Sequence, residues 1–174
     1  MGRIDDLISS LARVEKTLSN GEIMRRAFMR DKDTIEPLMC DMQREQLMKG
    51  KRADGNNIVP SYFEDPYFQE RKSARRYANY KAKVFGTAER HYSSPNLYIS
   101  GYFYNGFYVD FRADEISMEN SNRVVSGRNG HSQDLYAKYG KDTFGLSDGN
   151  WDIVLERIRP EMIDCIKETI QEAL

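Results

Sequence analysis

The sequence has few of the residues that build metal and redox sites. Its 174 residues include two cysteines, Cys40 and Cys165, and two histidines, His91 and His131. The cysteines lie far apart in stretches of helical periodicity, and no secretion signal is visible, so we expect free thiols; a disulfide is the alternative. Each histidine lies in a predicted loop, away from cysteine and from the other histidine, whereas zinc needs about four converging ligands. We therefore expect no metal and no cofactor.

Long apolar runs are also missing, and charge of neither sign dominates. The first twenty residues mix charged and apolar positions, unlike a signal peptide or a membrane span. With 26 basic and 27 acidic residues, the formal net charge is −1. This balance argues against a protein that coats nucleic acid or a membrane with its whole surface, although it is compatible with local charged patches. We expect no membrane partner.

Enzyme motifs are absent as well. The sequence contains no phosphate-binding Walker loop, dinucleotide fingerprint or nucleophile elbow. Asp65, Glu70 and Lys72 have the order of carboxylates and lysine found in some metal-dependent nucleases, which hold a cation between adjoining strands. Here these residues span a loop and a helix start, which favours a solvated run of charges. We expect no catalytic residues and no enzyme, with a small nuclease as a less favoured alternative.

What the sequence does contain is helical periodicity, and its length fits a single domain over residues 1–174. Apolar residues recur every three or four positions over 2–18, and the pattern resumes over 22–30 after a stop at 19–21. A third helix is predicted from a cap at Thr34 to about Lys49, ended by Gly50. Residues 1–49 therefore form an N-terminal helical part.

A long loop excursion is predicted next, over about 50–70, because this stretch is dense in glycine, asparagine, aspartate and proline. It contains a turn at 53–56, and we expect it to become ordered on a neighbouring molecule. A helix over 73–84 follows, with Ser73 as its cap and with Tyr77, Tyr80 and Val84 on one side.

The clearest strand signal is a hairpin near 107–119. Pairing 107–112 with 115–120 around a turn at 113–114 sets Phe111 opposite Ile116 and Val109 opposite Met118, and it gathers the apolar residues on one face. A turn at 105–106 has suitable chemistry but gives poorer pairs, so it is the rival hypothesis. The sequence thus predicts an α+β fold with a small antiparallel sheet.

The segment "SGYFYNGFYVDF" (100–111) raises a second question, because its rings resemble the signature of RNA-recognition sheets. That signature has a basic residue where Asn105 stands, and its spacing is one residue longer. In the preferred hairpin, Phe107 and Phe111 share a face with Ile116, which favours a buried role over base stacking.

The last third begins with 121–134, which is predicted to be a flexible loop. A C-terminal helix follows, with Ser147 as its cap. Pro160 lies inside it, so we expect a kink or break near Arg159.

The strongest local charge feature is a basic run on the predicted helix 71–83, which consists of Arg71, Lys72, Arg75, Arg76, Lys81 and Lys83. It is a solvated helix face, a contact for an acidic neighbouring subunit, or a contact for DNA. Because the chain has no net positive charge, we favour contacts with protein. Arg71, Lys72, Arg75 and Arg76 are the candidate partner contacts.

Several motifs occur in a fixed order: "QREQLMKGKRADGNNIVPSY" (43–62), "DPYF" (65–68), "NLYISGYFYNGFYV" (96–109) and "YAKYGKDTFGLS" (136–147). Together they resemble the head–tail joining, or neck, proteins of tailed phages that infect gut Bacteroidales, including the crAss-like phages. The positions that match are Gln46, Leu47, Gly50, Gly55, Pro60, Tyr62, Leu97, Ser100, Gly101, Phe103, Lys138, Tyr139, Gly140, Phe144, Gly145 and Leu146. The resemblance covers about 43–174 and leaves the N-terminal helix without support.

This resemblance implies a structural virion protein without catalysis, made in the host cytoplasm and located at the head–tail junction. Copies of the chain would form a connector ring between the portal protein and the other neck and tail ring proteins, with DNA only passing through the channel. It also implies that the segment from Ser100 opens a short helical turn. The alternative function is a nucleic-acid-binding phage protein that uses the basic helix 71–83 and an aromatic strand over 102–111.

Overall fold

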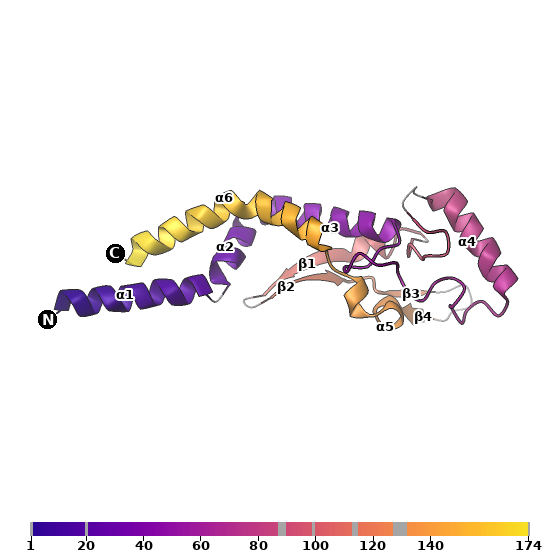
Figure 1. Ribbon diagram of the computed structural model, residues 1–174, viewed down its shortest axis with the longest axis horizontal. Coiled ribbons are helices and arrows are strands. Elements are labelled where there is room, and N and C mark those ends of the chain that lie inside the picture. The colour runs from indigo at the N-terminus through magenta and orange to yellow at the C-terminus, as the bar shows by residue number, and fades with distance from the viewer. Residues whose placement is uncertain are drawn as a thin grey trace.

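A computed structural model describes residues 2–19, 21–86, 90–98, 100–112, 115–126 and 132–173, with only the backbone for 2–7. The helices are α1 (Gly2–Ser19), α2 (Glu22–Arg30), α3 (Lys32–Met48), α4 (Arg71–Phe85), α5 (Leu135–Tyr139) and α6 (Asp148–Ala173), with 3₁₀ turns η1 (Tyr104–Gly106) and η2 (Lys141–Thr143). The strands are β1 (Phe107–Phe111), β2 (Ile116–Asn120), β3 (Val124–Ser126) and β4 (Ser132–Asp134). The α+β prediction is confirmed, in an elongated molecule (Figure 1).

The N-terminal helices agree with the sequence pattern except at one cap. Gly21 precedes α2 with φ of 76°, and Gly50 follows α3 with φ of 70°, so glycine stands where the backbone is left-handed. The predicted cap at Thr34 is wrong, because α3 already begins at Lys32 after Asp31. Asp31 alone separates the two helices: it follows the last residue of α2 and takes the N-cap position of α3, where its side chain makes no capping hydrogen bond.

The first hairpin has the predicted register. β1 pairs with β2 so that Phe111 lies opposite Ile116 and Val109 opposite Met118. The turn residues 113–114 lie outside the described residues. The rival turn at 105–106 forms η1 instead of a hairpin, so the strand begins at Phe107 rather than at 102. The 3₁₀ turn begins at Tyr104, four residues after the start at Ser100 that the resemblance implied.

The loop predicted over 121–134 contains a second, smaller hairpin, which corrects the prediction. β3 and β4 pair antiparallel, with Val125 opposite Gln133. β4 is polar throughout, and the two valines of β3 are adjacent, so these short strands lack the alternation of apolar and polar residues that reveals a strand. The side chain of Asp134 then caps α5 by accepting hydrogen bonds from the backbone N–H groups of Tyr136 and Ala137.

The last helix, α6, continues through Pro160 as one helix, so the predicted break near Arg159 is absent, and the helix is bent rather than straight (Figure 1). Val154, Ile158 and Cys165 are fully buried on one of its sides. Pro160 itself is exposed, and it lacks the N–H that a helix residue ordinarily donates to the carbonyl four positions earlier. Both cysteines are free, as predicted, and both are buried.

The core lies where α2, α3 and α6 pack against the first hairpin (Figure 1). Phe28 is fully buried there, with its ring 5.8 Å from that of Phe111 and 6.4 Å from that of Trp151. Phe107 and Val109 are buried from the strand side. The predicted apolar face of the hairpin is therefore the inner face of the sheet.

The predicted loop over 50–70 contains no helix or strand, and its turn is closed by a bridge between Lys51 and Asn57. Ile58 and Tyr62 are buried, and the Asp65 carboxylate accepts a hydrogen bond from Lys138 Nζ at 2.6 Å. The loop is thus anchored to its own chain, which corrects the expectation that it becomes ordered only on a neighbour.

Candidate interaction surfaces

Helix α4 lies at one end of the molecule and packs on loops (Figure 1). Ala74, Ala78 and Lys81 form its buried side. Tyr77 packs edge-on against the ring of Tyr62, with centroids 5.1 Å apart. The helix begins at Arg71 after Glu70, so Ser73 lies inside it and the prediction of Ser73 as the cap is wrong.

The apolar side predicted for this helix is not its buried side. Tyr77 is half-buried, but Tyr80 and Val84 are exposed. Ala74 and Ala78 contact the loops instead, because their small side chains let the loops approach closely. A search for apolar periodicity gives little weight to alanine and therefore misses this side.

The side of α4 that faces solvent is basic. Arg71, Lys72, Arg75, Arg76 and Lys83 are all exposed, and residues 71–85 contain no acidic side chain. Among the described residues, none of these five cations forms an ion pair, whereas most cations of α2 and α6 do. We call these five residues the basic face.

The sixth cation of the predicted run, Lys81, is not on this surface. Its side chain is only 2 % exposed, and its Nζ donates a hydrogen bond to the carbonyl oxygen of Tyr98 and lies 4.7 Å from the centre of the Phe85 ring. Burial, and then the charge of Arg90, lowers the pKa of Lys81 from 10.5 to about 8. No signal in the sequence separates this lysine from its exposed neighbours.

The lowered pKa predicts a pH-dependent stability. Between about pH 8 and 10.5 the folded chain loses the Lys81 proton while the unfolded chain keeps it, so the free energy of unfolding rises with pH in this window. The variant Lys81→Met lacks this contribution. Its free energy of unfolding relative to wild type should therefore fall by about 2 kcal/mol as the pH rises from about 7 to about 10.

Urea unfolding of both proteins at each pH measures this difference, in which the titration of groups common to both proteins cancels. A difference that stays constant with pH would show that Lys81 keeps its ordinary pKa in the folded chain.

A second surface lies at the opposite end, where α1 and the last turns of α6 extend from the core (Figure 1). Ile8 and Leu11 are 59 % and 56 % exposed, and Leu18 is also exposed on the same stripe of α1. On α6, Ile163 and Ile170 are exposed two turns apart. We call α1 and residues 161–173 the helical arm.

The aromatic segment does not form a stacking surface. Phe103, Tyr104 and Phe107 are buried, and the rings of Phe103 and Phe107 pack edge-on with centroids 5.1 Å apart. Tyr108 is partly exposed, but it lies on the other face of the strand and pairs across it with the acidic Glu119. Tyr102 is exposed as well, but it precedes the strand, so burial leaves Tyr108 as the exposed ring on β1 and argues against base stacking by an aromatic strand.

The residues considered for metal chemistry are held in other ways. Asp65 forms an ion pair with Lys138, while Glu70 and Lys72 are exposed at the start of α4. The Nδ1 atom of His91 lies 2.7 Å from Ser93 Oγ, and His131 lies outside the described residues. In the part of the chain that the structure describes, no three histidine, cysteine or acidic residues are grouped to hold a metal ion.

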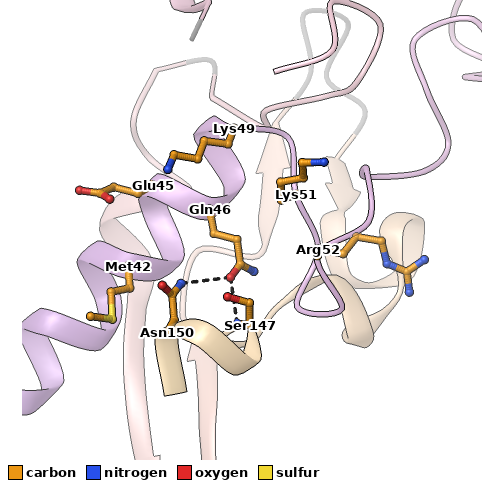
Figure 2. Close-up of a pocket in the computed structure, with 9 residues that line it drawn as sticks. Met42, Glu45, Gln46, Lys49, Lys51, Arg52, Ser147 and Asn150 are labelled. Atoms are coloured by element: carbon orange, nitrogen blue, oxygen red, sulfur yellow. Dashed lines mark hydrogen bonds between the residues drawn. The ribbon is translucent and has the colours of Figure 1, made fainter. Parts of the chain in front are cut away.

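A shallow pocket of about 180 Å³ lies between the end of α3, the turn at 51–55 and the start of α6 (Figure 2). Gln46 is at its base: its Oε1 accepts hydrogen bonds from the backbone N–H of Ser147 at 3.0 Å and from Asn150 Nδ2 at 3.3 Å. Lys49, Lys51 and Arg52 line the pocket but point in different directions (Figure 2). This arrangement joins two helices and does not direct several charges at one bound group.

Residues from three of the quoted motifs meet around this junction. Gln46 Nε2 donates to the carbonyl oxygen of Gly145 at 2.9 Å, and the Gly145 N–H donates to Gln43 Oε1 at 2.8 Å. The ring of Phe144 lies 5.6 Å from that of Phe103. The two buried glutamines are structural residues whose role emerges only when the segments are seen together.

Comparison with protein-family models, curated proteins and solved structures finds no match. Within the described ranges, every helix is too short or too polar to cross a lipid bilayer.

Proposed function

We propose that this chain is a structural subunit, without catalytic activity, of a ring in the head-to-tail connector of a tailed phage. Its partners are copies of itself, the portal protein and neighbouring neck or tail rings, and its place is the head–tail junction of the virion. The ordered motifs in 43–147 point to this protein class. The observation that carries the proposal is the exposed apolar stripe of the helical arm.

The apolar side of an amphipathic helix ordinarily packs against another part of the protein or against a partner, and on α1 this side is the exposed stripe. Ile8, Leu11 and Leu18 lie within one side of the helix, because successive residues turn by about 100°. Val14, at the edge of this side, is half-buried, so the chain covers only the margin of the stripe. Fully burying a leucine or isoleucine contributes about 1.5–3 kcal/mol, so a neighbouring copy that covers the stripe gains a substantial association energy.

The matched motif residues suit a structural role. Gln46, Phe103, Phe144 and Gly145 connect three distant segments of the chain in its interior. Resemblance concentrated in such residues supports a shared framework more than a shared reactive site.

A variant of the arm tests self-association. We predict that Leu11→Asp lowers the weight-average mass measured by sedimentation to that of the monomer, because a carboxylate in the stripe cannot be buried against a neighbour without a large desolvation cost. The control is Ser9→Asp, which adds the same charge to an exposed polar position of the same helix and should associate like wild type. Association of Leu11→Asp at wild-type strength would contradict the role of the stripe.

The place in the virion needs a separate measurement. Mass spectrometry of purified particles should detect the chain at ring stoichiometry, and a micrograph of the native particle should locate it beside the portal. Its absence from particles would refute the connector role whatever the arm does in solution.

A further inference from the structure

The basic face of α4 has a charge surplus that its surroundings do not neutralise. Its five cations form no ion pairs with the described residues, and the nearest acidic side chain in the sequence is Glu70, just before the helix. Arg71 lies over the ring of Phe63, 5.7 Å from its centre, which orients this guanidinium without balancing its charge.

Helix geometry places the strongest part of this charge directly opposite the buried side. Ala74, Ala78 and Lys81 face the loops, so with about 100° per residue Lys72, Arg76 and Lys83 lie at the centre of the solvent side. The three cations extend over about 16 Å, at about 1.5 Å per residue. They form a row along the helix rather than a cluster at one point.

The composition of the face distinguishes between two kinds of anionic partner. The centre of a protein interface is depleted of charged residues and contains apolar or aromatic anchors. Lys72, Arg76 and Lys83 lie at the centre of the basic face, and the exposed Tyr80 and Val84 follow this row along one side only. A row of cations without an apolar centre fits a line of phosphates, which is a partner that contributes charge along its whole length.

We propose that the basic face binds the phosphate backbone of double-stranded DNA without regard to base sequence. The net charge alone favoured a protein partner, but the folded chain separates its surfaces: the apolar arm and the basic face lie at opposite ends (Figure 1). This inference rests on the proposed function in one respect only, the identity of the DNA: it is the DNA that passes through the ring.

Binding to a short labelled duplex of mixed sequence, followed by fluorescence anisotropy at low salt, tests this proposal. The variant combines Lys72→Gln, Arg76→Gln and Lys83→Gln. We expect its affinity to fall at least about tenfold, and the slope of log K against log salt to decrease in magnitude by about 3, since each phosphate contact contributes about 0.9.

The matched control combines Arg157→Gln, Arg159→Gln and Lys167→Gln, which removes the same charge from exposed positions of α6. Its affinity and salt slope should stay close to wild type. Equal losses in both variants, or no wild-type binding at low salt, would overturn the proposal. Binding of poly-glutamate through the basic face, with no binding of DNA, would overturn it in favour of an acidic protein partner.

Sedimentation of the α4 variant separates this inference from the proposed function. The variant should self-associate like wild type, because the arm is intact. If the chain binds DNA but is absent from virions, the inference about the basic face holds and the connector role is refuted.

Discussion

Replacing Ile158 with alanine should lower the free energy of unfolding by about 2–5 kcal/mol. Ile158 is 0 % exposed on α6, within the core that joins α2, α3 and the first hairpin. Truncation removes the contacts of the buried methyl and methylene groups and leaves a cavity that rigid neighbours fill only in part. Because the free energy of unfolding of a domain is typically about 5–15 kcal/mol, this loss is a large share of the total.

The matched control for this prediction is Ile153→Ala, one and a half turns earlier on the same helix. Ile153 is 52 % exposed, so the variant makes the same chemical change and the same gain in helix propensity with little lost packing. Urea unfolding of the two variants should give free energies that differ by more than about 1.5 kcal/mol. Similar losses in both would show that Ile158 is not packed in the core.

Replacing Gln46 with leucine should cost about 3 kcal/mol of unfolding free energy, although leucine has a similar volume and a higher hydrophobicity. The substitution removes the acceptor of the Ser147 N–H and the donor to the Gly145 carbonyl. Each buried backbone group left without a partner costs about 1–3 kcal/mol. Because the pocket lies beside this junction, water can reach part of it, so the expected loss is smaller than the sum of the two largest costs.

Gln171→Leu is the control for Gln46→Leu. Gln171 is an exposed glutamine near the end of α6, so its replacement should change the free energy of unfolding by less than about 0.5 kcal/mol. Thermal or urea unfolding measures both. A Gln46→Leu variant as stable as Gln171→Leu would mean that water replaces the glutamine without cost.

The first hairpin shows what the sequence determines on its own. Val109 and Phe111 alternate with polar residues, as do Ile116 and Met118, and a shift by one residue moves half of this set to the solvent face. The register follows from that constraint, since one face of the sheet is buried. The amphipathic N-terminal helices follow from periodicity for the same reason.

The second hairpin and the buried side of α4 show where this reasoning ends. The pairing of β3 with β4 joins a strand with two adjacent valines to a polar strand, so no alternation of side chains indicates it. The orientation of α4 depends on Ala74 and Ala78, whose value is that they are small where the loops approach. The four predicted contacts Arg71, Lys72, Arg75 and Arg76 are exposed as their charge suggests, whereas Lys81 is buried by tertiary packing.

One consequence of the unbroken α6 is mechanical. A helix of 26 residues is about 39 Å long, so α6 connects the arm to the core directly. The start of α6 is hydrogen-bonded to Gln46 of α3, and its last turns carry the exposed Ile163 and Ile170 of the arm. We therefore expect a load that a neighbouring molecule places on the arm to reach the packing around Ile158 through the helix itself, because no loop interrupts α6.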